Sequence, residues 1–149
     1  MEIPKRILNA GCGKYPEKDK VNMDLVKMVG IDVVHNMDEF PYPFQDEEFD
    51  EIIARDVVEH LTDMIKVMEE FWRILKPGGR LWIRTNDAKY PERAWEDPTH
   101  KHAFTIHSFD YWDKTTFYGK EFGFYTKAQF KVIERVEKNM GIEITLIKV

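Results

Sequence analysis

The sequence contains a single cysteine, Cys12, in 149 residues. One thiol excludes an internal disulfide, a Cys-x-x-Cys centre and a cysteine-rich zinc module, and it favours a cytoplasmic location. No apolar run approaches the roughly 20 residues of a transmembrane helix, and the first residues do not resemble a secretory signal, so no membrane partner is expected. Basic residues are not in excess either, because 22 Lys and Arg face 27 Asp and Glu. A nonspecific grip on nucleic acid needs a basic field, so nucleic acid is not an expected partner.

Repeats, low-complexity tracts and Gly/Ser linkers are also missing. The length is that of one ordinary domain, and 43% hydrophobic residues are enough for a buried core. We therefore expect a single domain over residues 1–149.

Short apolar segments alternate with one clear helix. The expected strands are residues 6–10, 21–24, 31–35, 49–54 and 80–85. The run IDVVH at 31–35 is typical of a strand that is covered on both faces. The expected helix is 62–76, with one apolar face made of Met64, Met68, Phe71 and Leu75. Thr62 or Asp63 can cap its start, and Pro-Gly-Gly at 77–79 predicts its end.

The C-terminal part has a different pattern. Residues 130–138 and 142–149 both resemble strands, and Asn-Met-Gly at 139–141 connects them as in a hairpin. Strands that alternate with helices indicate parallel pairing, so we predict an α/β, Rossmann-like open sheet, mostly parallel, that finishes in an antiparallel hairpin.

Ligands of such sheets bind beyond the carboxyl ends of the strands. The first strand ends at Gly11-Cys12-Gly13, a turn that lets backbone N–H groups approach a ligand. A dinucleotide fingerprint needs a third glycine, where Pro16 stands, so pyrophosphate binding is not expected. Asp24 ends the second strand and can bind a ribose diol, and Asn36 follows the third strand at the height of an adenine. Each is also an ordinary turn residue, but together they predict a nucleoside pocket.

The order of NAGCG, VNMD, VVHNMDEFPYPFQDEEFDEIIARDVVEHL and FWRILKPGGRLWI resembles the class I S-adenosylmethionine-dependent methyltransferases, and within them the small type 11 methyltransferase domain group. The resemblance covers essentially the whole chain, because DPTHKHAFTIHSF at 97–109 is also similar to a segment in some of those enzymes. It implies S-adenosylmethionine as cofactor. The cofactor-binding residues that it implies are Gly11, Cys12 and Gly13 at the methionine end, Asp24 and Leu25 at the ribose, Asn36 and Met37 at the adenine, and Arg55 and Asp56 near the methionyl group and the acceptor.

Two features depart from the family. Asn36 stands where the family usually has Asp, which keeps an acceptor but loses a charge. Residues 14–20 allow at most a turn of helix, and the chain reaches its first strand without the N-terminal helices that often cover the cofactor. We therefore expect a fold trimmed at the N-terminus and first helix, whose pocket is open or is covered by a homo-oligomer or a partner subunit.

The candidate bases lie in the segment 97–107. His100 and His102 are the predicted catalytic residues, because an imidazole near neutral pKa suits deprotonation of a hydroxyl or an amine. Loop or packing roles are an open alternative for them and for His107. A metal site made of Asp97, His100 and His102 is a weaker alternative, and no metal is predicted.

Other polar residues near the strand ends have structural explanations. We interpret His60 as a packing residue at a helix start, and Asn86 and Asp87 as a turn. Nine aromatic residues crowd the segment 104–125, which is more than one covering helix needs. The excess predicts an acceptor pocket or an oligomer interface.

The function expected from these residues is methyl transfer from S-adenosylmethionine to an oxygen or nitrogen of a small or medium-sized acceptor. One alternative is a cofactor-binding, catalytically weak subunit that acts with a partner protein. A nucleotide-dependent oxidoreductase is disfavoured by the missing third glycine and the terminal hairpin. A macromolecular acceptor stays open, since an acidic chain can still carry a local basic face.

Overall fold

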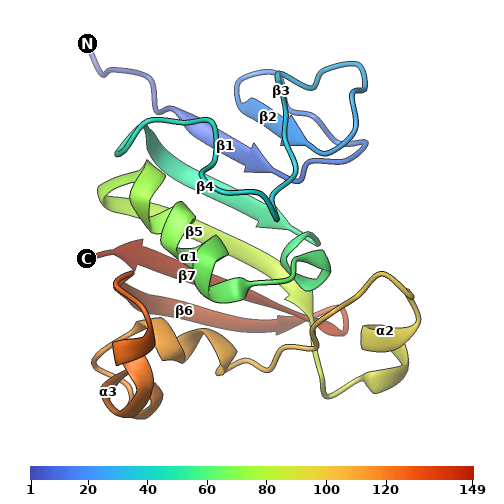
Figure 1. Cartoon of the computed structure of the whole chain (residues 1–149), viewed down its shortest axis with the longest axis vertical. Coiled ribbons are helices and arrows are strands. Elements are labelled where there is room, and N and C mark those ends of the chain that lie inside the picture. Colours follow the sequence, from blue (N-terminus) through green and yellow to red (C-terminus); the bar gives the residue numbers. More distant parts are fainter.

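A computed structural model describes residues 1–149, and its centre is one seven-stranded sheet (Figure 1). Across the sheet the strands follow the order β3-β2-β1-β4-β5-β7-β6. Their bounds are β1 Ile7–Ala10, β2 Val21–Asp24, β3 Val33–Val34, β4 Phe49–Arg55, β5 Leu75–Asn86, β6 Phe130–Lys138 and β7 Gly141–Lys148. All pairs from β3 to β5 are parallel, and β7 runs antiparallel to both β5 and β6. The predicted open sheet with a C-terminal hairpin is confirmed.

The strand β3 is shorter than the segment 31–35 that the sequence predicts. Only Val33–Val34 pairs with β2, and Asp32 instead uses its backbone N–H and its carboxylate to hold Asn22. Val34 is 51% exposed. The expectation of a strand covered on both faces is therefore wrong for this segment, because β3 forms the edge of the sheet.

The helix α1 covers the middle of the sheet from Met64 to Ile74. Asp63 caps it by accepting a hydrogen bond from the Lys66 N–H at 3.1 Å. The helix ends earlier than predicted, because Leu75 already pairs with Phe49 of β4. The next residue pair in that ladder is Glu51 with Arg80, so Pro-Gly-Gly at 77–79 bulges out within β5 and does not end the helix.

The other helical elements are short. They are η1 Val58–His60, α2 Pro91–Trp95, η2 Ser108–Trp112, α3 Phe117–Phe122 and η3 Gly123–Tyr125. No helix lies between β1 and β2 or between β2 and β3, as expected for a trimmed scaffold. No helix in the structure has the length and apolar content needed to cross a bilayer.

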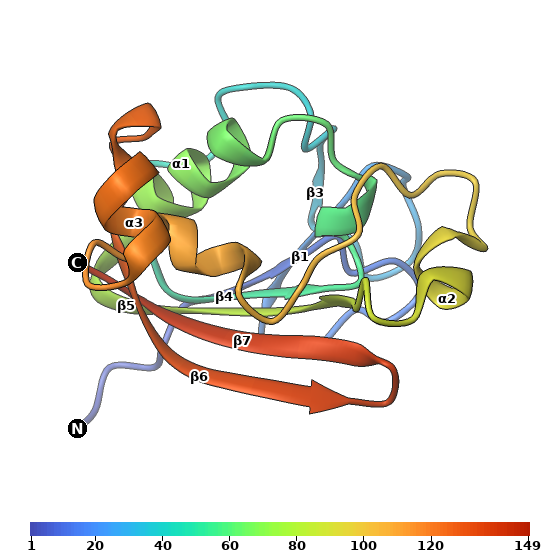
Figure 2. The ribbon, with the colours of Figure 1, turned by 90° about the horizontal axis from the view of Figure 1, so that it is seen from below.

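The two faces of the sheet differ (Figure 2). The helices α1 and α3 lie on one face, and no helix covers the other. Alternate residues of the central strands, including Leu8, Ile52 and Leu81, enter the core on the covered face. The opposite alternation forms a partly exposed surface, here called the open face, whose members include Ile53, Arg80, Trp82, Arg84, Glu143 and Ile147.

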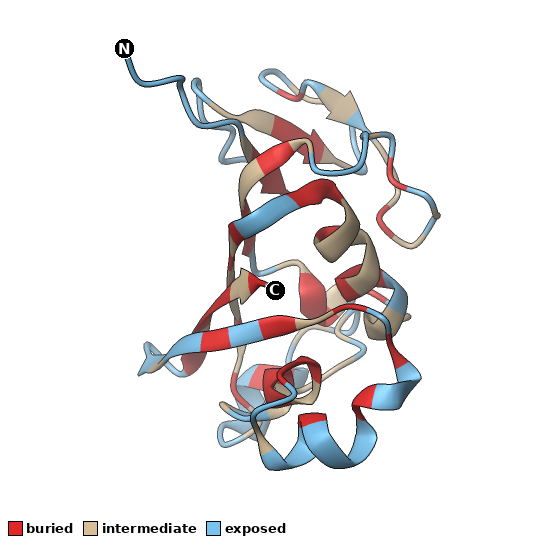
Figure 3. Cartoon of the chain, turned by 90° about the vertical axis from the view of Figure 1, so that its left-hand side faces the viewer, coloured by how far each residue is buried: buried red, intermediate tan, exposed pale blue.

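The aromatic segment after β5 divides between core and surface. Phe104, Phe109 and Trp112 are buried under the sheet's covered face. Five others are exposed, on or next to α3, which Figure 3 colours almost entirely as exposed: Phe117, Tyr118, Phe122, Phe124 and Tyr125. None of the nine lines the two cavities described below.

Candidate functional site

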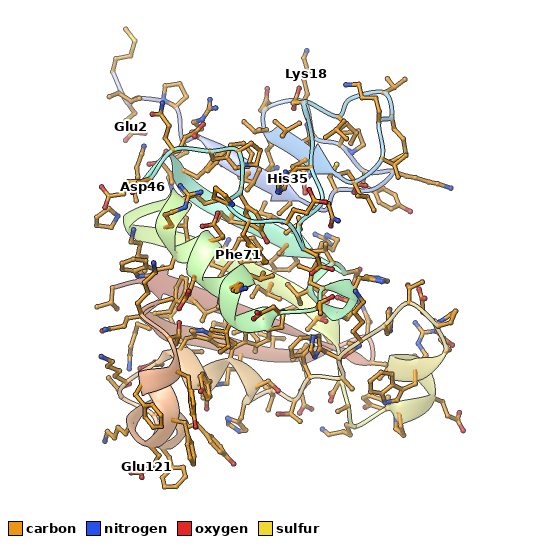
Figure 4. The ribbon with its side chains drawn as sticks, in the orientation of Figure 1. Glu2, Lys18, His35, Asp46, Phe71 and Glu121 are labelled. Carbon is orange, nitrogen blue, oxygen red and sulfur yellow. The ribbon has the colours of Figure 1, made fainter.

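A cleft of about 770 Å³ lies beyond the carboxyl ends of β1, β2 and β4, and is here called the nucleoside cleft. Figure 4 labels His35, which follows β3 and lies at this end of the sheet. The segments after β1, β2, β3 and β4 and the loop near residue 100 supply its lining: Gly11, Gly13, Asp24, Leu25, His35, Asn36, Met37, Asp38, Asp56, Val57, His60, Leu61, Pro98, Thr99 and Lys101. The structure therefore brings Gly13, Asp24 and Asn36 together, as the sequence predicts.

The glycine turn begins the cleft. Gly11 and Gly13 have φ angles of 64° and 54°, a region that favours glycine. A Cβ on Gly11 would lie 2.2 Å from Cγ2 of Val57, so that position also needs glycine for close packing against the segment after β4. Cys12 lies between them with 7% of its surface exposed. Burial, and then the nearby charge of Asp24, raise the pKa of its thiol to about 11.

Asp24 already helps to shape this turn. Its Oδ2 accepts a hydrogen bond from the Gly13 N–H at 2.8 Å, and its Oδ1 accepts one from the Val26 N–H at 3.2 Å. Each carboxylate oxygen keeps a further lone pair for a ligand hydroxyl. Leu25, next in the chain, is 61% exposed and supplies apolar surface to the cleft.

Asn36 and Met37 form the next part of the lining. The Asn36 Oδ1 accepts a hydrogen bond from the Asp38 N–H at 3.0 Å, so Asn36 also forms the turn that is the ordinary role of such a residue. Its second lone pair stays available to an adenine amine. Met37 is buried in the core, and its carbonyl accepts a hydrogen bond from the Tyr42 hydroxyl at 3.0 Å.

Asp38 ties three segments of the cleft together. It accepts hydrogen bonds from the Thr62 N–H at 2.7 Å and the Thr62 hydroxyl at 3.0 Å, and Lys101 Nζ lies 3.3 Å from its Oδ2. Burial alone would raise the pKa of Asp38, but these hydrogen bonds and the lysine charge outweigh it and lower the pKa. Asp38 therefore stays ionised and holds Thr62 and Lys101 together at the edge of the cleft.

Arg55 ends β4 and Asp56 follows it, and their side chains point to different places. The guanidinium of Arg55 lies 4.9 Å from the ring centroid of Trp82 on the open face, and Arg55 also lines a hollow of about 240 Å³ beside Cys12 and Gly13. Asp56 adopts a φ of 49° and pairs with Arg84 of β5. Asp56 lines both that hollow and the nucleoside cleft, so the two continue past the glycine turn.

A second cavity of about 330 Å³, here called the polar cavity, lies beside the cleft and shares Asp56 and His60 with it. Its lining comes from η1, the end of β5, the α2 region and the β6–β7 turn: Asp56, Glu59, His60, Arg84, Thr85, Asn86, Arg93, Glu96, Asp97, His100, Asn139, Met140 and Gly141. Only one of these thirteen residues is hydrophobic, so the polar cavity suits a polar ligand.

Glu59, His60 and His100 gather at one end of the polar cavity. One potential ligand atom from each lies within 4.8 Å of the other two, so these residues could hold a metal ion. The two imidazole rings meet edge to face with centroids 4.7 Å apart. Glu59 is only 3% exposed, and burial raises the pKa of its carboxyl group.

The other predicted polar residues lie elsewhere. His102 lines neither cavity, and its Nε2 is buried without a hydrogen-bond partner. The potential metal ligands that come together around His100 are Glu59 and His60, so the alternative cluster of Asp97, His100 and His102 does not form. The Asn86 amide bonds the His102 carbonyl at 2.8 Å and the Phe104 N–H at 3.0 Å, and Asp87 caps a turn at Lys89. Asp87 therefore forms the predicted turn, whereas Asn86 holds the loop at residues 102–104 and lines the polar cavity.

Sequence reasoning missed the part that Glu59 and His60 play at the site. The motif VVEHL resembles a helix start, but η1 turns both side chains toward the loop that carries His100. The adjacent Glu59 and His60, a few residues after the end of β4, are the only local signal, and they do not indicate His100 as a neighbour.

The cleft can accommodate an adenosyl cofactor. Its volume lies within the range of about 300–1,000 Å³ for ligand pockets. Asp24 and Asn36 offer acceptors, Leu25, Val57 and Leu61 offer apolar surface, and the carboxylates of Asp24 and Asp56 suit a cationic group.

Comparisons with known proteins agree with this geometry. Residues 17–83 match the family model described as "Methyltransferase domain". Phosphoethanolamine N-methyltransferase 2 of Caenorhabditis elegans is 33% identical over 57 residues, which are 38% of this chain and 13% of that relative's length. The match thus spans a small part of that longer protein.

Solved structures share the fold over nearly the whole chain. A S-adenosylmethionine-dependent methyltransferase from Archaeoglobus fulgidus has a TM-score of 0.68 at 13% identity, covering 97% of this chain and 86% of the other. The methyltransferase in a complex with the activator Trm112 of Haloferax volcanii has a TM-score of 0.65 at 12% identity, covering 97% and 82%. With the strand order, they show that this chain has the fold of the class I S-adenosylmethionine-dependent methyltransferases, and residues 17–83 carry the match to the methyltransferase domain family.

Proposed function

We propose that this protein transfers a methyl group from S-adenosylmethionine to an oxygen or nitrogen of a small or medium-sized polar acceptor. The carrying observation is the pair of adjoining cavities that share Asp56 and His60. One cavity has the chemistry of a nucleoside site, and the other is lined almost wholly by polar groups. A methyl group transferred from a cofactor in one cavity to an acceptor in the other would pass close to Asp56 and His60.

Residues of the nucleoside cleft would hold the cofactor in a fixed direction. Asp24 would accept hydrogen bonds from the ribose hydroxyls, with Leu25 against them, and Asn36 and the Met37 backbone would contact the adenine. Gly11, Cys12 and Gly13 would hold the methionine end through their backbone groups. Asp56, which lines both cavities, would then lie next to the acceptor, and Arg55 would line the hollow beside the methionine end.

When bound, the cofactor supplies an electrophilic methyl group on a sulfonium, so the chain mainly has to align an acceptor. A base is needed only for an acceptor that must lose a proton. His100 lines the polar cavity and is the candidate for that role. His102 was predicted for the same role, and only a movement of its loop would bring it to the cavity.

Thermal stability in the presence of ligands tests the cofactor assignment. Because a ligand that binds the native state raises the melting temperature by mass action, S-adenosylhomocysteine should stabilise the protein and NAD should not. Asp24→Ala should lower the affinity for S-adenosylhomocysteine by about tenfold or more, since a charge-assisted hydrogen bond contributes about 1.5–3 kcal/mol. His100→Ala should leave that affinity unchanged. No stabilisation of the wild type by S-adenosylhomocysteine would refute the proposal.

A second candidate function is a cofactor-binding, catalytically weak subunit that works with a partner protein. The Haloferax volcanii complex with an activator is an example of a methyltransferase of this fold that has a protein partner. The two candidates differ in one measurement. Methyl release from labelled S-adenosylmethionine with pooled metabolites supports the first if the isolated chain is active, and the second if it binds cofactor but turns nothing over.

A further inference from the structure

We propose that Glu59, His60 and His100 form a binding site for a divalent transition-metal ion, with Zn²⁺ as the ion that best suits the ligands. Two imidazoles and one carboxylate are a common zinc ligand set in sites that keep an open coordination position. The proposed site is at the end of the polar cavity that adjoins the nucleoside cleft.

The geometry is close to what an ion requires. The three ligand atoms lie within 4.8 Å of one another, although they come from η1 and from a loop forty residues later in the chain. Bond lengths of about 2.0–2.1 Å put tetrahedral ligand atoms about 3.3 Å apart, so binding needs a contraction of about 1.5 Å at most. Small rotations of His60 and His100, which are only partly buried, are enough for that.

The hydrogen bonds around His100 leave one ring nitrogen free to bind an ion. Nδ1 of His100 lies 2.7 Å from the Ala94 carbonyl. A carbonyl can only accept, so Nδ1 carries the proton and the lone pair of the neutral ring is on Nε2. An N–H bonded to a backbone carbonyl is the usual outer partner of a metal-binding histidine.

His60 is oriented in the same way through a chain of hydrogen bonds. The Thr99 hydroxyl donates to Asp97 Oδ1 at 2.7 Å, so its oxygen accepts the proton from Nδ1 of His60 at 2.9 Å. The Nε2 lone pair of His60 is therefore free as well. Glu59 is held by the Thr85 hydroxyl, which donates to its Oε2 at 2.9 Å and leaves Oε1 available.

The charges of the polar cavity also favour a divalent cation. Two arginines line it, and each is already paired, Arg84 with Asp56 and Arg93 with Glu96. Glu59 and Asp97 have no lysine or arginine within 4.0 Å, which leaves two carboxylates beside two imidazoles. A buried carboxylate such as Glu59 is costly without a cation. Two negative charges and two free lone pairs match one doubly charged ion.

The metal site lies where the acceptor of the proposed methyl transfer would bind. A role for the ion in that reaction rests on the proposed function, whereas the binding of the ion does not. Three protein ligands leave a fourth position open toward the polar cavity. An acceptor hydroxyl bound there would lose its proton to solvent water more easily, because a bound cation would lower its pKa. His100 then acts as a ligand and not as the base.

The test is calorimetric titration of the chain with Zn²⁺ alone, and with Co²⁺ as a visible-absorption probe of coordination. We expect one ion per chain. His60→Asn and His100→Asn keep a donor for Thr99 and Ala94 but remove Nε2, and Glu59→Gln keeps an acceptor for Thr85. Each should weaken Zn²⁺ binding by about 100-fold or more, since loss of an outer-shell partner alone costs about 10- to 100-fold in affinity.

His107→Asn is the matched control, since His107 Nδ1 also bonds a neighbour, Asp110, at 3.0 Å, but lies outside the cluster. It should bind Zn²⁺ as the wild type does. Melting temperatures of the variants without metal separate loss of a ligand from loss of the fold. No stoichiometric binding to the wild type, or equal binding to all four variants, would overturn the site. A S-adenosylhomocysteine shift without Zn²⁺ binding would overturn this inference alone.

Discussion

The side chain of Cys12 shows how burial and a neighbouring charge control a single reactive group. Burial and the neighbouring Asp24 carboxylate raise the pKa of its thiol from 9.0 to about 11. Since only the thiolate is nucleophilic, a rise of two pKa units reduces the reactive fraction about 100-fold at pH 8.

We therefore expect iodoacetamide to alkylate native Cys12 at least about 100-fold more slowly than the unfolded chain at pH 8. The rate should keep rising with pH to about 11, because the thiolate fraction rises until the pH passes the pKa. Mass spectrometry of timed samples measures both. Asp24→Asn, which removes the charge, should increase the rate, and an unchanged rate would contradict this cause of the shift.

Single residues also show how far the sequence alone leads. The turn at Gly11 and Gly13 and the carboxylate at Asp24 were predictable, because each stands at the end of a strand and parallel strands end at one edge. Glu59 and His60 were not predictable as a pair with His100, because no local pattern tells that a loop forty residues away returns to η1. The roles of Arg55, Asn36 and His100 stay predictions.

Among the elements, the connection from β3 to β4 depends most on one side chain of α1. The Arg73 guanidinium donates to the Phe44 carbonyl at 2.9 Å and the Tyr42 carbonyl at 3.1 Å. It also pairs with Asp46 and Glu70. Because Tyr42 bonds Met37, this network fixes the connection that carries one side of the nucleoside cleft.

Arg73→Met should therefore destabilise the fold by about 2–4 kcal/mol, the usual cost of breaking a partly buried charged network. It should also weaken the binding of S-adenosylhomocysteine, since Tyr42, which bonds the Met37 carbonyl, would no longer be held by Arg73. Urea unfolding and ligand titration measure the two effects. Arg6→Met is the control, because Arg6 and Glu48 form a more exposed pair, which should contribute less than about 1 kcal/mol. Equal losses in both variants would show that the network has no special role.

Element boundaries were predictable where one signal dominated. Residues 21–24 and 130–138 have the predicted bounds, because apolar side chains and turn residues agree there. The predicted end of the helix was wrong, because Leu75 pairs with Phe49 of β4 before the Pro-Gly-Gly sequence is reached. A long-range contact of this kind leaves no mark in the local sequence.

On the scale of the whole molecule, one face of the sheet is covered by helices and carries the apolar core, and the other is the open face. Trp82 is half-buried there, and Arg55 lies over its ring. The side chain of Phe71, on α1, is fully buried on the covered face (Figure 4). Long polar side chains with apolar stems shield the open face in place of helices.

Trp82→Ala should therefore cost about 1–2 kcal/mol, well below the roughly 3–5 kcal/mol expected for Phe71→Ala in the core. Urea unfolding gives both values. The unfolding midpoint of the wild type should not depend on protein concentration if the open face is exposed to water. A loss for Trp82→Ala as large as that for Phe71→Ala would mean that something covers this face in solution.

Asp56 and His60 belong to two cavities at once, which has a thermodynamic consequence. A molecule bound on one side fixes the side-chain conformations that a molecule on the other side meets, so each occupant changes the affinity for the other. Such an effect is reciprocal by necessity. The two compartments should thus fill cooperatively or antagonistically, and the sign of that linkage would reveal whether substrate and cofactor enter as a pair.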